Sequence, residues 1–348
     1  MQQLYGIVMG GVNSEIKHEI PESMSSRLRE NVFVFSGAKT YTELRDLGSL
    51  LVGENGNIKP FHQFWQDTRQ IHNTYNKTYL EAEYLFATQS AHAANQWAEI
   101  EADGDDYNLQ YRTANDDRVR EEHWILHDIT LPPSDPFWKS YYPPNGWRCR
   151  CRAVQVRKSK YPVSDSEKAS ELGKQATTVI GKDGRNTAAM FRFNPGKEKV
   201  IFPESHPYFN ELNKGSKKAL ERAYATQRVK ELRAWAKENI AGETVSNKGL
   251  EKAINITNTG IKEFLNQPHM QYAEKNELVK DIKNIVANAK YLGKKKYHKE
   301  NQKIVSSHIF EIKIKGKKSW LIAREDINGN INLYSISDSD KVLLGIKK

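Results

Sequence analysis

Two groups of residues carry side chains that could do chemistry. In the first, His123 follows Asp117 and precedes Cys149 and Cys151, two cysteines separated by a single residue. One imidazole, two thiols and a carboxylate are the ligand types of a tetrahedral zinc site. The second group lies after residue 250, where histidines, cations and hydroxyl side chains occur along segments with a strand-like pattern. Side chains of these types can serve in acid-base chemistry and in phosphate binding.

The sequence leaves two interpretations of the cysteine group open. A structural zinc ion held by Asp117, His123, Cys149 and Cys151 would explain how a proline-rich segment with little apolar core stays ordered. In the alternative, which the tight Cys-x-Cys spacing favours, His123 and Asp117 hydrogen-bond locally and both thiols stay free. Two such closely spaced cysteines exclude a disulfide framework and fit synthesis in a reducing compartment.

The positive charge of the chain is concentrated towards its C-terminal end. Residues 1–210 contain 25 Lys/Arg and 27 Asp/Glu, whereas residues 211–348 contain 28 and 16, so the C-terminal part alone accounts for the net charge of +10. This asymmetry indicates a polyanionic partner, most simply a nucleic acid, or else a lysine-rich solvated surface. No stretch approaches the roughly 20 apolar residues of a membrane span, so no membrane partner is expected.

The elements that must position the first group follow from the apolar spacing. Apolar residues recur at three- and four-residue steps within 14–100, which predicts a mainly helical N-terminal part. Residues 107–156 are rich in Trp, Pro and Arg and predict a loop-rich motif with one short helix at 116–126. Residues 157–215 predict an extended linker that packs on other parts of the chain, and 216–239 a basic helix.

The elements that must position the second group predict an α+β domain. Helices are expected at about 258–267 and 274–290, and strands at 304–315, 319–325 and 331–337. Asn328-Gly329 is a strong hairpin signal between the last two strands. The lysine run at 294–296 is interpreted as a solvated turn that attracts RNA without specificity. Helices followed by an antiparallel meander are typical of the α+β class.

Three sequence words in the loop-rich motif carry a family resemblance. They are 111–123 (YRTANDDRVREEH), 135–138 (DPFW) and 143–152 (PPNGWRCRCR). Their order resembles the C-terminal part of the phage Mu protein F-like minor head, or head morphogenesis, proteins, over about residues 30–160. The resemblance implies a phage or prophage minor capsid protein of the virion head, made in the bacterial host cytoplasm. It implies portal and capsid proteins as partners and no catalysis in this part.

A second resemblance covers about residues 250–346. It rests on 263–269 (EFLNQPH), 288–293 (NAKYLG), 308–320 (HIFEIKIKGKKSW) and 333–337 (LYSIS). These words are similar to the phage-borne branch of the nuclease superfamily that unites barnase, EndoU, the colicin tRNases and RelE-like toxins. The resemblance implies a metal-independent ribonuclease effector that needs no cofactor. An immunity protein would be a further partner of such a toxin, and the sequence leaves its existence open.

The chemistry implied by the second resemblance is transesterification by the ribose 2′-hydroxyl. A base removes the hydroxyl proton, an acid protonates the leaving oxygen, and cations or hydroxyls stabilise the phosphorane. The candidate catalytic residues are His269, His308, Lys318, Arg324, Tyr334 and Ser337, with His298 as a third available histidine. His308 lies on an apolar strand face. A histidine on such a face is more often a hydrogen-bonded core residue than a desolvated acid or base.

These observations predict a multidomain chain. It comprises a mainly helical head-morphogenesis part with its loop-rich motif (1–156), a polar linker with a basic helix (157–244) and a basic α+β nuclease-like domain (245–348). The favoured hypothesis is a minor head protein that carries a ribonuclease effector. The alternative is a purely structural head protein whose basic C-terminal domain binds packaged nucleic acid without catalysis. A metal-dependent nuclease built on the central motif is disfavoured, because the motif has no carboxylate cluster suited to magnesium.

Overall fold

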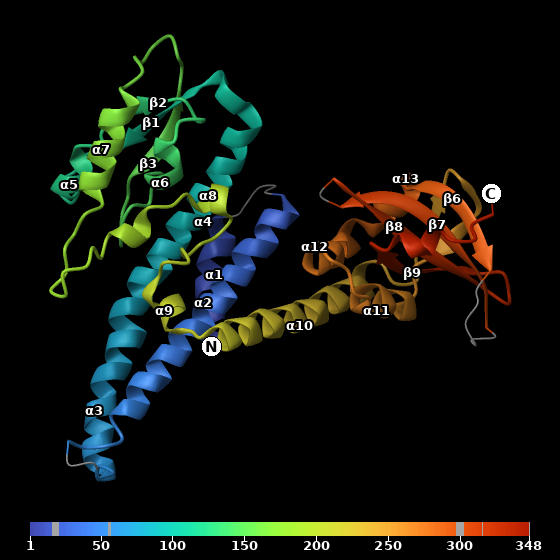
Figure 1. Cartoon of the computed structure of the whole chain (residues 1–348), viewed down its shortest axis with the longest axis horizontal. Helices are drawn as coiled ribbons and strands as arrows, with labels where there is room; N and C mark the ends of the chain where they lie inside the picture. The colour runs from blue at the N-terminus through green and yellow to red at the C-terminus, as the bar shows by residue number, and fades with distance from the viewer. Residues whose placement is uncertain (16–20, 55–56, 297–302, 315, 348) are drawn as a thin grey trace. The chain divides into compact units, whose positions relative to one another are not determined.

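The computed structural model describes residues 1–15, 21–54, 57–296, 303–314 and 316–347 (Figure 1). The chain divides into two compact units, Met1–Glu221 and Arg222–Lys348. The division falls inside the segment that the sequence analysis treats as linker and basic helix, because the last helix of that segment contributes residues to the second core. The expected class is confirmed, with a helical N-terminal part and an α+β C-terminal part.

The first unit is built on long helices, as the apolar spacing predicts. They are α1 (Gln2–Glu15), α2 (Glu22–Ser49), α3 (Phe61–Asn73) and α4 (Leu80–Asp103), with a π-helical turn, η1 (Thr74–Tyr79), joining α3 to α4. α1 packs on both α2 and α4 (Figure 1). Their facing sides form an apolar core that includes Leu28, Phe35 and Phe86. No helix of the described residues is long and apolar enough to cross a membrane.

A buried ion pair joins α2 to α4 inside this apolar core. The ammonium group of Lys39 contacts a carboxylate oxygen of Glu83 and donates a 2.8 Å hydrogen bond to the carbonyl of Tyr75. The hydroxyl of Tyr208 donates to the other oxygen of Glu83 at 3.1 Å. Burial raises the pKa of Glu83, while Lys39 opposes that shift. Because each charged group here has a partner, the pair fixes how the two helices align.

The expected linker packs on the helices, as predicted, and contains short helices of its own. They are α7 (Ser166–Ala176), η3 (Ala189–Phe191), α8 (Pro195–Glu198) and α9 (Pro207–Glu211). The side chain of Asn31 on α2 bonds the backbone of Ile201 and Phe202 at 2.7 to 2.9 Å. Phe202 stacks on Phe35 with ring centroids 3.5 Å apart. This segment therefore completes the helical core that the first hundred residues begin.

The loop-rich motif forms a small antiparallel sheet with its own core. Strands β1 (Asn108–Arg112), β2 (Thr130–Leu131) and β3 (Arg152–Val156) lie in the order β2-β1-β3. The helix expected at 116–126 is shorter than predicted, because turns replace its first part and only α5 (Glu121–Trp124) is helical there. A second one-turn helix, α6 (Phe137–Ser140), places Phe137 and Trp138 in the motif's core beside Tyr111 and Tyr142.

The second unit contains a six-stranded sheet in the order β4-β5-β9-β8-β7-β6, in which β5 and β9 are parallel and every other pair is antiparallel. The strands are β4 (Thr244–Asn247), β5 (Leu250–Asn255), β6 (Lys290–Lys296), β7 (Ile304–Ile314), β8 (Lys317–Asp326) and β9 (Ile331–Ser337). Helices α10 (Lys214–Asn239), α11 (Asn258–Asn266), α12 (Tyr272–Glu277) and α13 (Ile282–Asn288) accompany it, with 3-10 turns η4 (Leu278–Asp281) and η5 (Asp340–Leu343). Leu232 and Ala236 of α10 enter its core.

The three strands expected after residue 304 are confirmed, and the structure adds three more. The lysine run at 294–296, interpreted as a turn, instead ends the edge strand β6. Its backbone pairs with β7, and Lys295 donates to the carbonyl of Val342 at 2.6 Å. Lysines are frequent on edge strands because they discourage further strand pairing. The charge of this run concealed its strand pattern from the sequence.

Candidate functional site

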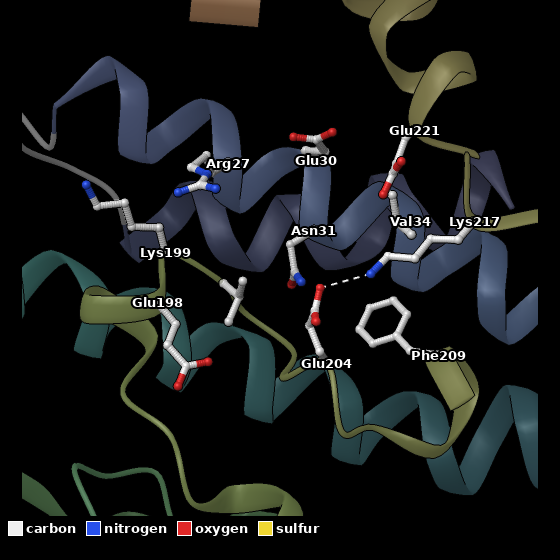
Figure 2. Close-up of a pocket in the computed structure, with 11 residues that line it drawn as sticks. Arg27, Glu30, Asn31, Val34, Glu198, Lys199, Glu204, Phe209, Lys217 and Glu221 are labelled. Carbon is white, nitrogen blue, oxygen red and sulfur yellow. Dashed lines mark hydrogen bonds and ion pairs between the residues drawn. The ribbon is translucent and has the colours of Figure 1, made fainter. Parts of the chain in front are cut away.

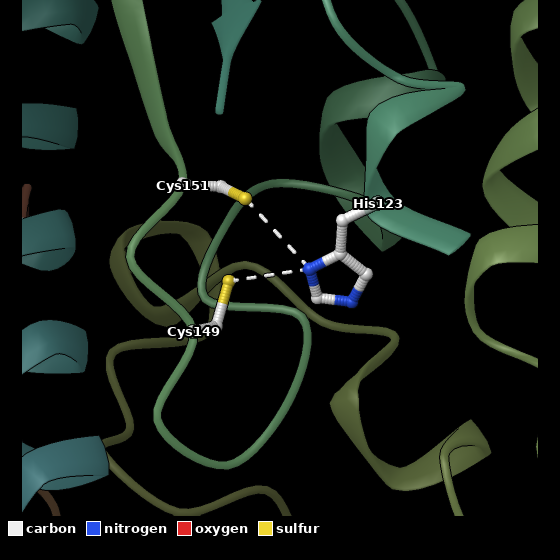
Figure 3. A group of neighbouring side chains, drawn as sticks. All are labelled: His123, Cys149 and Cys151. Carbon is white, nitrogen blue, oxygen red and sulfur yellow. Dashed lines mark hydrogen bonds between the residues drawn. The ribbon is translucent and has the colours of Figure 1, made fainter. Parts of the chain in front are cut away.

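The cysteine group is brought together as the first interpretation requires. The Nδ1 atom of His123 lies 3.7 Å from the Sγ atom of Cys149 and 3.7 Å from that of Cys151 (Figure 3). The three ligand atoms all lie within 4.8 Å of one another, and all three residues are buried. Figure 3 shows both sulfur atoms directed at the same ring nitrogen.

Local backbone geometry explains why both thiols face the histidine. His123 is on the one-turn helix α5, and Cys151 directly precedes strand β3. Arg148 adopts a left-handed conformation (φ 56°), which turns the chain just before Cys149. Arg150, between the two cysteines, makes two 2.6 Å hydrogen bonds to Asp116. Because the alternate side chain is held outwards, the cysteines on either side of it point inwards together.

The electrostatics of this group favour a single thiolate shared by the pair. Hydrogen bonds from Cys151 and His123 hold the pKa of the Cys149 thiol well below its ordinary value. The neighbouring sulfur and burial raise the pKa of Cys151. The hydroxyl of Tyr111, which donates to Asn145 at 3.0 Å, also lies within hydrogen-bonding reach of Cys151. A buried negative charge thus faces polar donors on one side.

Asp117, the expected fourth ligand, is exposed and lies outside the group. The side that would complete a four-coordinate site faces a cavity of about 450 Å³. Arginine side chains line much of this cavity beside the three ligand residues, namely Arg118, Arg120, Arg148 and Arg150. The sequence analysis placed arginines around the cysteines but gave no indication of a cavity.

A second site gathers four of the six catalytic candidates in the C-terminal unit. His269, Arg324, Tyr334 and Ser337 line one cavity of about 440 Å³. The guanidinium carbon of Arg324 lies 3.1 Å from the centroid of the Tyr334 ring. Asp338 lines the same cavity, and its carboxylate accepts a 2.6 Å hydrogen bond from the backbone of Met270. The sequence analysis missed Asp338, which directly follows the last strand.

Two hydrogen bonds define the state of His269. Its Nδ1 atom accepts from the backbone N–H of Gln271 at 2.9 Å, which places the ring proton on Nε2. Nε2 then donates to the hydroxyl of Ser319 at 3.3 Å. Burial lowers the pKa of His269, the charge of Asp338 opposes that shift, and the nearby Lys275 adds to it. His269 is therefore a neutral donor here, and the role of base expected for a histidine falls to another group.

Lys275 supports the loop that carries His269. It is fully buried and donates to the carbonyls of Phe264 and of Gln267, the latter at 3.0 Å. Desolvation lowers the pKa of Lys275 to about 7. These carbonyls lie at the C-terminal end of helix α11, where the helix dipole stabilises a positive charge. The sequence gave no indication of this role, because nothing in it distinguishes a buried lysine from a solvated one.

His308 and Lys318 are not brought to this cavity. His308 is buried; its Nδ1 accepts from Tyr291 at 2.9 Å, and its Nε2 faces Glu325 at 3.4 Å. That is the arrangement of a hydrogen-bonded core histidine. Lys318 is exposed and faces Glu311 at 3.4 Å. His298 lies outside the described residues.

A third cavity, of about 270 Å³, lies against α2 in the first unit (Figure 2). Its lining mixes both charges, including Arg27, Glu198 and Lys199, and Lys217 pairs with Glu204 at 2.9 Å. Burial raises the pKa of Glu198. No residue predicted from the sequence lines it, and its lining holds four glutamates against three cationic side chains.

The similarity of the chain to known proteins divides at the same place as its fold. Residues 52–154 match the family model described as Phage Mu protein F like protein. We call these residues the Mu F-like region, after the family model that they match. The Mu F-like region runs from the end of α2 through the cysteine group. Residues 223–334 match the model described as Large polyvalent protein-associated domain 3.

Two curated proteins are similar to part of this chain. The putative capsid assembly protein F of Escherichia phage Mu is 30% identical over 143 residues, which are 40% of this chain and 30% of that protein. The Mu-like prophage FluMu F protein of Haemophilus influenzae is 35% identical over 120 residues, 31% of this chain and 28% of that protein. The chain thus spans less than a third of the length of either relative. No solved structure matches the chain.

Proposed function

We propose that this chain is a minor head protein that acts in phage capsid assembly. The observation that carries this proposal is the Mu F-like region itself, which contains the motif's sheet, its buried aromatic core and the cysteine group. The relative in phage Mu is named as a putative capsid assembly protein. The partners are then the portal and capsid proteins of the same phage, and the location is the virion head, after synthesis in the host cytoplasm.

Deletion of the gene from the phage or prophage that encodes the chain tests this function. Induced lysates should contain few DNA-filled heads, and the wild-type chain supplied in trans should restore them. Mass spectrometry of purified particles should detect the chain in heads. A normal yield of filled, infectious particles from the deletion strain would contradict the proposal.

A second function, cleavage of RNA by the C-terminal unit, is supported by the cavity around His269. Arg324 and Ser337 from the two neighbouring strands β8 and β9 meet His269 and Asp338 there. A guanidinium group suits the charge of a phosphorane, and a cavity of this kind can hold a phosphate with one ribose. The matching family model ends at residue 334, so it includes His269 and Arg324 but neither Ser337 nor Asp338.

The roles follow from the hydrogen bonds of the site. Asp338 takes the proton of the ribose 2′-hydroxyl, and the freed oxygen attacks phosphorus. Arg324 and the Nε2–H of His269 stabilise the added negative charge. The bond to the 5′-oxygen breaks, that oxygen takes up a proton from solvent, and the products are a 2′,3′-cyclic phosphate and a 5′-hydroxyl. No metal takes part in these steps.

Cleavage of tRNA and total RNA by the full chain, with EDTA present, tests this second function. His269→Ala and Asp338→Asn should each lower the rate by about 10²–10⁴-fold. His308→Ala should leave it nearly unchanged, because His308 lies outside the cavity. Absence of cleavage, together with salt-sensitive DNA binding that survives all three substitutions, would instead support a genome-binding domain.

A further inference from the structure

The geometry of His123, Cys149 and Cys151 is difficult to explain by hydrogen bonds alone. Both sulfur atoms approach the same Nδ1 atom, each at 3.7 Å. A ring nitrogen carries one proton or one lone pair, so it makes one good hydrogen bond in its plane. A single ion between the three atoms would satisfy all of them at once. Two thiolates and an imidazole are ligands that select zinc over magnesium or calcium.

We propose that these three residues bind a zinc ion through Nδ1 of His123 and the Sγ atoms of Cys149 and Cys151. Zinc bonds of about 2.3 Å to sulfur and 2.0–2.1 Å to nitrogen, at tetrahedral angles, separate the two atoms by about 3.6 Å. The two separations of 3.7 Å in the structure agree with this value. The ligands therefore already lie where the ion requires them, without a change in the fold.

The surroundings of the group supply what a zinc site needs beyond its ligands. The Tyr111 hydroxyl, whose proton is directed to Asn145, lies beside Cys151 and restricts the position of its sulfur atom. The motif holds its elements by two short helices and a three-stranded sheet, one strand of which has two residues. An ion that ties α5 to the chain before β3 would stabilise this loop-rich arrangement directly.

The fourth position of the ion faces the arginine-lined cavity and takes a small anion or a water molecule. Among the described residues, no Asp or Glu lines this cavity, and Asp117 is exposed outside the group. Two thiolates neutralise the ion. Arg148 pairs with Glu81, and Arg118 and Arg150 share Asp116, so four guanidinium groups face two carboxylates and leave a net positive surrounding that favours an anionic ligand.

Metal analysis of the full chain, purified without a histidine tag, tests the zinc site. We expect one zinc per chain, and Cys149→Ser, Cys151→Ser and His123→Ala should each lower the affinity by about 100-fold or more. His72→Ala is the matched control, because the His72 side chain is 68% exposed. Asp117→Ala should also retain full occupancy. A folded wild-type chain with both thiols free to react in excess zinc would overturn the proposal.

Replacement of zinc by cobalt(II) separates loss of the site from loss of the fold. The wild-type chain should show thiolate-to-cobalt charge-transfer bands, and Cys151→His, which keeps a ligand, should bind cobalt with about half their intensity. Unchanged bands in that variant would exclude Cys151 as a ligand. Azide should shift the visible bands of the wild type. Bands that do not shift with azide, or that disappear in Asp117→Ala, would show that a protein side chain occupies the fourth position.

Discussion

The two candidate sites of this chain differ in how their polar groups are spaced. In the cysteine group, three donor atoms converge within 4.8 Å of one another and all are buried. Both groups line cavities of similar volume, but around His269 the side chains bond their own neighbours instead of converging on one point. Atoms that converge leave room for an ion, whereas groups held apart leave room for a substrate. The same residue type, histidine, serves both because its partners differ.

A large effect that would sharpen this comparison is expected at Arg324, beyond the effects already expected at His269 and Asp338. Arg324→Ala should lower RNA cleavage by about 10²–10³-fold, because it removes the guanidinium group that we propose stabilises the phosphorane in this cavity. The cleavage rate of Arg324→Lys should lie between those of the wild type and Arg324→Ala, because a lysine keeps the charge but loses the planar fork. Steady-state kinetics on a short RNA measures both. Equal rates in all three proteins would show that this cavity does not bind the reacting phosphate.

A smaller effect is expected at Tyr111, behind the cysteine group. Tyr111→Phe removes the hydroxyl that donates to Asn145, so the buried amide oxygen of Asn145 loses this hydrogen-bond donor. We expect the free energy of unfolding of the first unit to fall by about 1–3 kcal/mol, and zinc affinity to fall about tenfold or more. Urea unfolding and competition with a chelator measure these. RNA cleavage should not change, and a change there would break the separation of the two sites.

Lys275 predicts a pH dependence confined to the second unit. Its pKa is lowered from 10.5 to about 7 in the folded chain by desolvation. Between these pH values the unfolded chain binds more protons, so the free energy of unfolding should rise with pH across that window. Urea unfolding at pH 7 and at pH 9, followed by a signal from the second unit, measures the rise. In Lys275→Met the free energy of unfolding should no longer rise between these two pH values. A rise that persists in this variant would show that another group causes it.

The smallest effect is expected at Asp116, close to the cysteine group in sequence. Its two bonds to Arg150 hold the pKa of Asp116 at about 2, but the pair lies at the surface. Asp116→Asn should therefore leave zinc content and the unfolding midpoint unchanged. Metal analysis and thermal unfolding check this. Loss of zinc in this variant would mean that the outward position of Arg150 is needed to direct both cysteines inwards.

The sequence predicted periodic elements well and contacts between distant residues poorly. The long helices and the last three strands follow from apolar spacing, which is local information. β6 was missed because lysines mask its alternation, and Asp338 because a carboxylate after a strand has no distinctive pattern. The convergence of His123 with Cys149 and Cys151 was one of two open interpretations. The arginine-lined cavity beside them depends on a turn at Arg148, and this turn has no recognisable sequence pattern.

The hydrogen bonds from Asn31 to Ile201 and Phe202 have a consequence for folding during synthesis. They join residues about 171 positions apart, and Phe202 supplies the ring that stacks on Phe35. At translation rates of 5–20 residues per second, the first helices emerge about 10–30 s before the segment that completes their core. The motif with the cysteine group is made within that interval. On the ribosome, the proposed zinc site can therefore be complete in sequence before the helical core is closed.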